Sequence, residues 1–433
     1  MTEQRTLDER VAPERPAGPA LSRRRLLGTA GAAGAAGLVT GGAGAAFGAA
    51  ALRDDPTPLT SVGATGVPFR DGTHQAGITT PRQARGHLMA FDLAPGQGRE
   101  NAAALLSRWT NAAQEMTVGR LATDDDQIAW DAGPNSLTIT FGFGRSLFTR
   151  TGLEAQLPAA LAPLPAYSAD ALDPARSNGD LWVQIGSDDA LVAFHALRVL
   201  QKTAGDTVRV RWQMNGFNRT PGATLEPMTS RNLMGQVDGT NNPKATDPDF
   251  DARIFVPAGG TARSPEWMAG GSYAVVRRIR MLLDSWDHLS VEQQEKVIGR
   301  RKGNGSPLSD GVHSTDSSET APVDLDKRDD LGAPAIAGDA HIRVAAPASN
   351  GGAAMLRRPF SFHDGIGSDG SPDAGLLFVC WQADPQRGFV PVQRKLDRGD
   401  GLSRFLRHES SGLFAVPGAP GSGEYVGQRL LES

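Results

Sequence analysis

The sequence contains one cysteine, Cys380, among 433 residues. The chain can therefore form no internal disulfide, and a metal cluster held by several cysteines is excluded. A long stripe of lysine and arginine is also missing from the body of the chain, and the formal net charge is only −4. Because binding to phosphate backbones needs a basic surface, we expect no nucleic-acid partner.

The composition that remains is that of a globular protein. Hydrophobic residues make up 39% of the chain and charged residues 21%. These fractions are typical of soluble globular proteins rather than of disordered or membrane proteins. A chain of 433 residues is long enough for two or three domains and can bury a large core without disulfides or structural metals.

The first fifty residues differ from the rest. Residues 22–27 read Ser-Arg-Arg-Arg-Leu-Leu, and an uncharged stretch rich in alanine and glycine continues to Arg53. This pattern resembles a twin-arginine export signal, which we predict for residues 1–51, followed by a proline-containing linker at 52–70. A retained membrane-spanning helix is the alternative, although so many glycines disfavour a helix.

An export signal of this type implies a partner and a location. The twin-arginine translocase moves folded proteins, so we expect a cofactor that is inserted before export. We expect the mature protein to be extracellular or in the cell envelope, which includes the periplasmic space.

The periodicity of apolar residues predicts the fold class. From 71 to 228 the expected order is strand 87–93, helix 101–116, strand 137–143, strand 181–185, helix 191–203 and strand 208–214. This is the split βαβ order of a ferredoxin-like domain. A second domain of this type is predicted for 229–433, giving an α+β protein with antiparallel sheets. Its expected strands include 273–279, 340–344, 375–381 and 411–416, and a polar insertion interrupts it at about 303–333.

The sharpest motif in the chain is Gly-Gln-Val-Asp-Gly-Thr at residues 235–240. Two glycines around an acid let the backbone approach a flat ligand closely while the carboxylate of Asp238 is fixed over it. Taken alone, an Asp-Gly pair is more often a simple turn, because both residues favour turns. The motif therefore indicates a function only together with other segments of the chain.

Those segments give the sequence a resemblance to the dye-decolourising peroxidases. They are Gly-Asp-Ala-His-Ile-Arg at 338–343, Met-Leu-Arg-Arg at 355–358 and Gly-Leu-Leu-Phe-Val-Cys at 375–380, and Gln-Ala-Gly-Ile-Thr-Thr-Pro at 75–81 opens the body. Several motifs in the same order are more specific than one, and the resemblance extends over the whole chain after the linker. It is strongest to the exported branch of the family, which includes the deferrochelatases of iron uptake.

The resemblance implies a cofactor and a set of site residues. The cofactor would be haem b (iron protoporphyrin IX), bound in the C-terminal domain with His341 as the iron ligand. Asp238 and Arg357 would be catalytic, and Phe378 would form an apolar wall. The other expected cofactor contacts are Gly235, Gln236, Val237, Gly239, Thr240, Arg358 and Asp384.

Two of these contacts carry a further expectation. Asp384 is predicted to accept a hydrogen bond from the second ring nitrogen of His341, which would raise the basicity of the ligand. Arg357 and Arg358 are adjacent, and only one of them can point into the pocket if the segment is extended. We assign Arg357 to the catalytic role.

The activity implied by the resemblance is reduction of hydrogen peroxide with oxidation of dyes, phenols or another small-molecule or protein electron donor. Release of iron from haem and haem binding without turnover stay open as alternatives. Large donors cannot reach a buried haem, so aromatic side chains could relay electrons, although ordinary core packing is the alternative for each. The candidates are Trp212, Trp267, Tyr273, Trp286 and Trp381. A homo-oligomer is compatible with the sequence.

Overall fold

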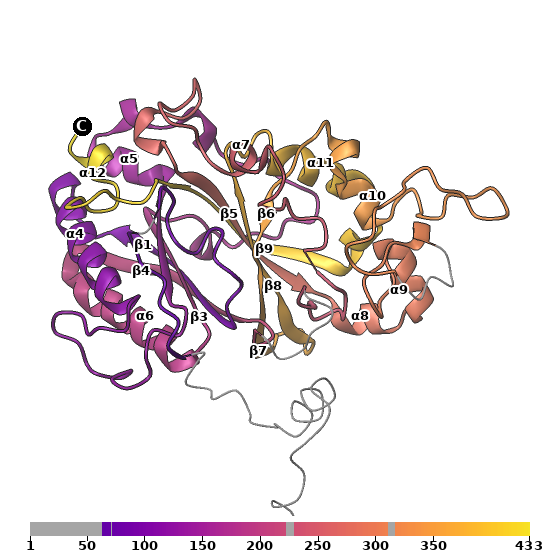
Figure 1. Ribbon diagram of the computed structural model, residues 1–433, viewed down its shortest axis with the longest axis horizontal. Coiled ribbons are helices and arrows are strands. Elements are labelled where there is room, and N and C mark those ends of the chain that lie inside the picture. Colours follow the sequence, from indigo (N-terminus) through magenta and orange to yellow (C-terminus); the bar gives the residue numbers. More distant parts are fainter. Residues whose placement is uncertain (1–62, 71, 222–228, 311–316) are drawn as a thin grey trace, which may run out of the picture. The chain divides into compact units, whose positions relative to one another are not determined.

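The computed structural model describes residues 63–433 except 71, 222–228 and 311–316 (Figure 1). The predicted export signal at 1–51 and most of the predicted linker lie outside the described residues. Within the described part of the chain, no helix is both long and apolar enough to cross a membrane.

The N-terminal half follows the predicted order of elements. These are β1 (Arg85–Leu93), α4 (Arg99–Met116), β2 (Thr138–Gly144), α5 (Arg145–Thr151), β3 (Leu181–Ser187), α6 (Ala190–Ala204) and β4 (Val208–Phe217). Helix α6 begins at residue 190 because the Asp189 carboxylate accepts hydrogen bonds from the backbone N–H groups of Leu191 and Val192. The helix then buries one apolar face against the sheet.

The C-terminal half has more elements, and short helices join its strands. They are α7 (Phe250–Ile254), β5 (Ser272–Met281), α8 (Leu283–Asp287), α9 (Val291–Ile298), α10 (His341–Ala345), β6 (Leu356–Arg357), β7 (Phe360–Ile366), β8 (Pro372–Gln382), α11 (Phe389–Gly399), β9 (Leu406–Val416) and α12 (Gln428–Leu431). The prediction of a strand at 340–344 was wrong, because this segment forms α10. Five residues are too few for apolar spacing to distinguish a strand from one helical turn.

Within the described residues, nine strands form one antiparallel sheet in the order β5-β9-β2-β3-β1-β4-β7-β8-β6. Strand β8 also pairs with β5 over eight residue pairs, from Gln382 opposite Tyr273 to Gly375 opposite Arg280. The sheet therefore closes on itself into a barrel-like arrangement. Helices α4 and α6 lie beside the N-terminal strands, while α9, α10 and α11 lie beside the C-terminal ones (Figure 1).

The two halves of the sheet meet at two short seams. Strands β2 and β9 share two residue pairs, and β4 and β7 share one, Phe217 opposite Ser361. Gly216 permits the second seam, because a Cβ at this position would lie 2.5 Å from the Cβ of Phe360. Glycine therefore permits the close approach of backbone that joins the halves.

The side chains inside the barrel form a core that both halves share. Trp182 of β3 stacks on Phe414 of β9 with ring centroids 5.4 Å apart, and its indole lies 5.9 Å from that of Trp381 in β8. All three side chains are fully buried. The described residues from 63 onward accordingly belong to one compact unit.

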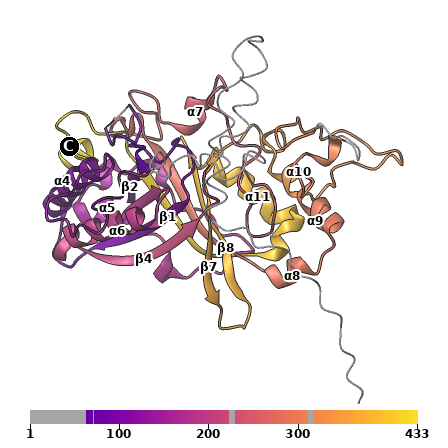
Figure 2. The ribbon, with the colours of Figure 1, turned by 60° about the horizontal axis from the view of Figure 1, so that its bottom comes forward.

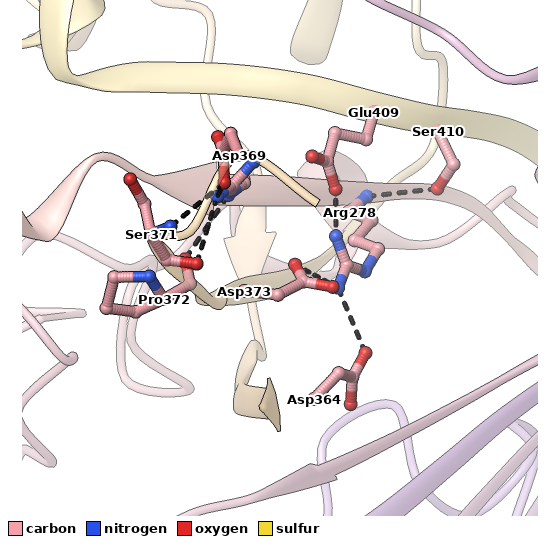
Figure 3. A network of polar contacts seen from close by, with 9 residues as sticks. Arg278, Asp364, Asp369, Ser371, Pro372, Asp373, Glu409 and Ser410 are labelled. Atoms are coloured by element: carbon pink, nitrogen blue, oxygen red, sulfur yellow. Dashed lines mark hydrogen bonds and ion pairs between the residues drawn. The ribbon is translucent and has the colours of Figure 1, made fainter. Parts of the chain in front are cut away.

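An arginine-centred network ties the projecting β7–β8 hairpin to the sheet (Figures 2 and 3). Arg278 of β5 is 1% exposed and forms ion pairs with Asp364 at 2.9 Å and Asp373 at 2.7 Å. It also pairs with Glu409 of β9 and lies 3.8 Å above the ring of Phe362. One buried cation therefore holds three carboxylates from three strands.

We predict that Arg278→Met destabilises the protein by about 3 kcal/mol, because three carboxylates would then lie together without their cation. The matched control is Arg280→Met, whose partner Asp369 is 52% exposed. This second change should cost less than about 1 kcal/mol. Urea denaturation of both variants measures the free energies of unfolding, and equal losses would contradict the central role of Arg278.

Candidate active site

A cavity of about 590 Å³ lies among the elements of the C-terminal half. Its wall is formed by the 232–247 loop and by residues of β5, α10, β6, β8 and α11. Its size lies within the range of small-molecule and cofactor sites. Residues His341, Asp238, Arg357 and Phe378, which were predicted from separate motifs, all line it.

His341 is the first residue of α10, and its imidazole is held by Asp400. The Nδ1 atom lies 2.7 Å from Oδ2 of Asp400. Because an ionised carboxylate only accepts hydrogen bonds, Nδ1 carries the proton and the lone pair of Nε2 is left for a ligand. Burial lowers the pKa of His341, but the charge and hydrogen bond of Asp400 outweigh it, so that the pKa is raised.

Asp400 is itself held rigidly where α11 ends. Its Oδ1 accepts a hydrogen bond from the backbone N–H of Leu402 at 2.9 Å, and its side chain is 2% exposed. The backbone N–H of the next residue, Gly401, donates to the carbonyl of Asp339 at 2.9 Å. The segment before His341 and the segment after α11 are therefore joined directly, which orients the imidazole.

The expectation that Asp384 would bind His341 is not met. Asp384 pairs with Arg263 at 2.8 Å and accepts a hydrogen bond from the backbone of Gln386, and it does not line the cavity. The carboxylate follows β8 and belongs to a local turn. The carboxylate that contacts His341 instead is Asp400, which the sequence analysis did not predict. An N-cap pattern before residues 401–405 marks it in the sequence, but local sequence does not identify the histidine that it meets.

Asp238 and Arg357 form an ion pair in the cavity wall. Nη1 of Arg357 lies 3.1 Å from Oδ1 of Asp238, and the two side chains are 25% and 16% exposed. The other carboxylate oxygen of Asp238 accepts a hydrogen bond from Nδ2 of Asn232 at 3.3 Å. The carboxylate is thus oriented from both sides while part of it stays accessible.

Asn242, which the sequence analysis did not assign, fixes the loop to strand β6. Its Nδ2 donates to the carbonyl of Arg357 at 2.8 Å, and its Oδ1 accepts from the N–H of the same residue at 3.1 Å. Its own backbone N–H donates to the carbonyl of Gly239. These two hydrogen bonds to one residue keep the turn that carries Asp238 next to Arg357.

The remaining predicted contacts divide into two groups. Gln236, Val237, Gly239 and Thr240 line the cavity with Phe378, whereas Gly235 and Arg358 do not. Gly235 has φ +77° and lies in the turn, where a Cβ would stand 2.7 Å from Lys302. Arg358 follows Arg357 in extended backbone, so its side chain points to the opposite side.

One further residue of the wall, Arg300, was not predicted. Arg300 is buried, and its Nη1 donates to the carbonyls of Gly305 and Glu319 at 2.7 and 3.2 Å. Burial, together with the charge of Arg357, lowers the pKa of Arg300 to about 10. Among the described residues, Nε of Arg300 and Nε2 of Gln236 have no partner.

The five aromatic residues considered as electron relays are all buried, with exposures of 8% or less. Trp381 belongs to the core of the barrel, and the indole N–H of Trp286 donates to the carbonyl of Met234 at 3.2 Å. These environments fit ordinary packing. Among the described tryptophans, Trp130 is the one with a largely exposed side chain, at 64%.

Comparisons with known proteins agree with the site. The family descriptions "Dyp-type peroxidase, N-terminal" and "Dyp-type peroxidase, C-terminal" match residues 75–218 and 229–420. A dye-decolorizing peroxidase from Thermobifida fusca is 46% identical over 369 residues, covering 83% of this chain and 84% of the relative. A deferrochelatase from Escherichia coli is 35% identical over 374 residues, covering 83% and 86%. The crystal structure of a DyP-type peroxidase from Streptomyces coelicolor is 65% identical with a TM-score of 0.83, covering 87% of this chain and 100% of that one.

The fold and these matches define an enzyme of the haem peroxidase class. Within that class, the chain belongs to the Dyp-type peroxidase family, as its motifs predicted. Its fold is the mixed helical and antiparallel fold of that family. Its substrates are accordingly hydrogen peroxide and an electron donor.

One wall residue predicts a pH dependence of stability. His408 of β9 lines the cavity and is 5% exposed. Burial, together with the charge of Arg277, lowers the pKa of His408 to about 3. An unfolded histidine has a pKa of about 6.5. As the pH falls below that value, the unfolded chain binds a proton that the folded chain does not, so the folded state loses stability.

We therefore expect His408→Gln to flatten the pH dependence of unfolding between pH 6.5 and pH 4. As the pH falls, the free energy of unfolding of the wild type should decrease by up to about 1.4 kcal/mol per pH unit through this one group, and that of the variant should not. Urea denaturation at several pH values measures the slope, with each protein referred to its own stability at pH 8. An unchanged slope would disprove the assignment.

Proposed function

We propose that this chain binds one haem b in the cavity, with Nε2 of His341 as the protein ligand that would hold its iron. The observation that carries the proposal is the hydrogen bond from Nδ1 of His341 to Asp400, which leaves Nε2 as the ring nitrogen for a metal. The unpartnered donors of Arg300 and Gln236 suit the carboxylates of a porphyrin. Apolar residues such as Phe378 and Ile279 suit its ring.

The bound haem supplies an iron centre that receives the oxidising power of peroxide and passes it to a donor one electron at a time. Asp238 takes the proton from one oxygen of hydrogen peroxide and returns it to the other, so that water can leave. Arg357 donates hydrogen bonds to the oxygen on which negative charge grows as the O–O bond breaks. Asn232 and Asn242 hold these two side chains in place.

The electron donor is a dye, a phenol or another one-electron donor, either a small molecule or a protein. The family membership supports this range, and the buried position of the aromatic residues supports donors that reach the cavity themselves.

Release of iron from haem is the second candidate function. The similarity to the Escherichia coli deferrochelatase, at 35% identity, supports it. The two functions differ in their products, since iron release leaves free porphyrin and peroxidase turnover leaves intact haem with oxidised donor.

We also propose export by the twin-arginine translocase to the cell envelope or the medium, supported by the arginine and leucine pattern at residues 22–27. The N-terminal sequence of the mature protein tests this, because a chain that keeps residues 1–51 after export would contradict it. We also propose that the protein forms a homo-oligomer, and a measurement of its molecular mass in solution tests this.

The barrel is best understood as two ferredoxin-like units with a boundary near residues 228 and 229. In support, both halves share one strand order when the strands of each half are counted along the chain without the two-residue β6. Across the sheet the fourth strand is followed by the first, the third and the second, which is β4-β1-β3-β2 in the first half and β9-β5-β8-β7 in the second.

For the catalytic pair, Asp238→Asn and Arg357→Leu should each lower peroxide-driven oxidation by about 10²- to 10⁴-fold. Haem binding should persist in both, because neither residue is the proposed ligand. Stopped-flow spectra after addition of peroxide measure the rate, and the Soret absorbance measures the haem content. Wild-type rates in both variants would refute the roles assigned to these residues.

For the proximal pair, Asp400→Asn should weaken haem binding about 10- to 100-fold, because the amide no longer accepts the proton of Nδ1 as a carboxylate does. Asp384→Asn is the matched control, since Asp384 pairs with Arg263 instead, and its affinity should stay at the wild-type value. Titration of haem into both apoproteins measures the dissociation constants. The assignment fails if the two variants bind haem equally well.

A further inference from the structure

A second, much smaller pocket lies on the other side of β6 from the cavity. Its lining comprises Gly77, Arg82, Gln83, Gln184, Asn218, Arg358, Pro359 and Phe360. Arg357, the last residue of β6, lines the large cavity, and the next residue, Arg358, lines this pocket. The volume of about 10 Å³ is close to the space of one water molecule or one small ion.

The charge of this pocket is unbalanced. Arg82 and Arg358 both line it, and no carboxylate does. Both side chains are partly buried, and an arginine keeps its positive charge in proteins. Burial, with the nearby charge of Arg82, lowers the pKa of Arg358 to about 9. The two guanidinium groups therefore repel each other at short range.

The described part of the chain supplies no counter-charge to Arg358, whereas Arg82 lies near the carboxylates of Asp238 and Glu319, whose charges partly offset the effect of burial on its pKa. No described residue forms an ion pair or a side-chain hydrogen bond with Arg358, and Arg82 makes one long bond, from Nη2 to the carbonyl of Asp238 at 3.5 Å. A buried charge without a partner destabilises a folded protein. A single negative charge between the two groups would remove both the repulsion and the unpaired burial.

We propose that this pocket binds one small monovalent anion, such as a halide, between the guanidinium groups of Arg82 and Arg358. Water is the competing occupant, because Oε1 of the buried Gln184 has no donor among the described residues and would accept a hydrogen bond from water. Two cations in the lining favour the anion over water alone.

The site lies next to the catalytic turn. Gly239 has φ +109°, and a Cβ there would lie 2.6 Å from Nη2 of Arg82. Glycine thus allows Arg82 to approach the carbonyl of Asp238. An anion that fixes Arg82 also stabilises this turn, which makes Arg82 a positioning residue for Asp238. The site itself does not depend on haem, so its test differs from those of the proposed function.

The direct test uses crystals of the haem-loaded protein grown without halide and then soaked in sodium bromide. We expect an anomalous bromide peak in contact with both guanidinium groups, and no such peak in Arg358→Met. A pocket that contains only water density, or a peak that persists in the variant, overturns the proposal.

The solution test measures the thermal midpoint during bromide addition, with gluconate keeping the ionic strength constant. The wild type should show a saturable rise, and Arg358→Met should lose it. Arg82→Met serves the same purpose if Arg358→Met does not fold. Arg85→Met is the matched control, because Arg85 is exposed on β1, and it should keep the rise.

Bromide bound at the haem would also raise the midpoint, so the visible spectrum is recorded in the same titration. Binding in the proposed pocket leaves the Soret band unchanged. The site is contradicted if the Soret band changes over the same range of bromide concentration as the thermal midpoint. It is also contradicted if the thermal midpoint rises equally in wild type and in Arg358→Met.

Discussion

The pairing of β5 with β8 is the interaction on which the rest of the structure depends. Its eight residue pairs close the sheet, and β8 also pairs along its other edge with β6 and β7. The strand opposite Arg357 is therefore the strand that carries Phe378. Since Ile279 and Met281 of β5 face the same cavity, closure of the sheet brings three walls of the site together.

Strand β6 ends at Arg357, and the alternation of side chains from Arg357 to the next residue, Arg358, separates two environments. Arg357 points to the cavity and pairs with Asp238, while Arg358 points to the small pocket, where the described residues provide no counter-charge. The double hydrogen bond with Asn242 fixes the register of this short strand. Because a shift by one residue would exchange the two arginines, this amide decides which of them reaches the carboxylate of Asp238.

The histidine and its carboxylate show where sequence reasoning reached its limit. The motif around His341 identified the residue, although its segment forms a helix and not the predicted strand. The partner could not be chosen in the same way, because Asp384 and Asp400 both begin local turns or caps. Asp400 meets the imidazole since Gly401 bonds to Asp339 across 62 residues of sequence, a contact that no local pattern encodes.

The sequence by itself determined the family and the order of elements in the N-terminal half, and it predicted Asp238, His341 and Arg357, which line one cavity, since motifs and apolar periodicity are properties of neighbouring residues. Only the tertiary structure decided that the strands close into a barrel, that Asp400 holds His341, and that Arg358 leaves the cavity. Those outcomes depend on contacts between segments far apart in the chain, and the free energy of such contacts is set by packing and charge in three dimensions.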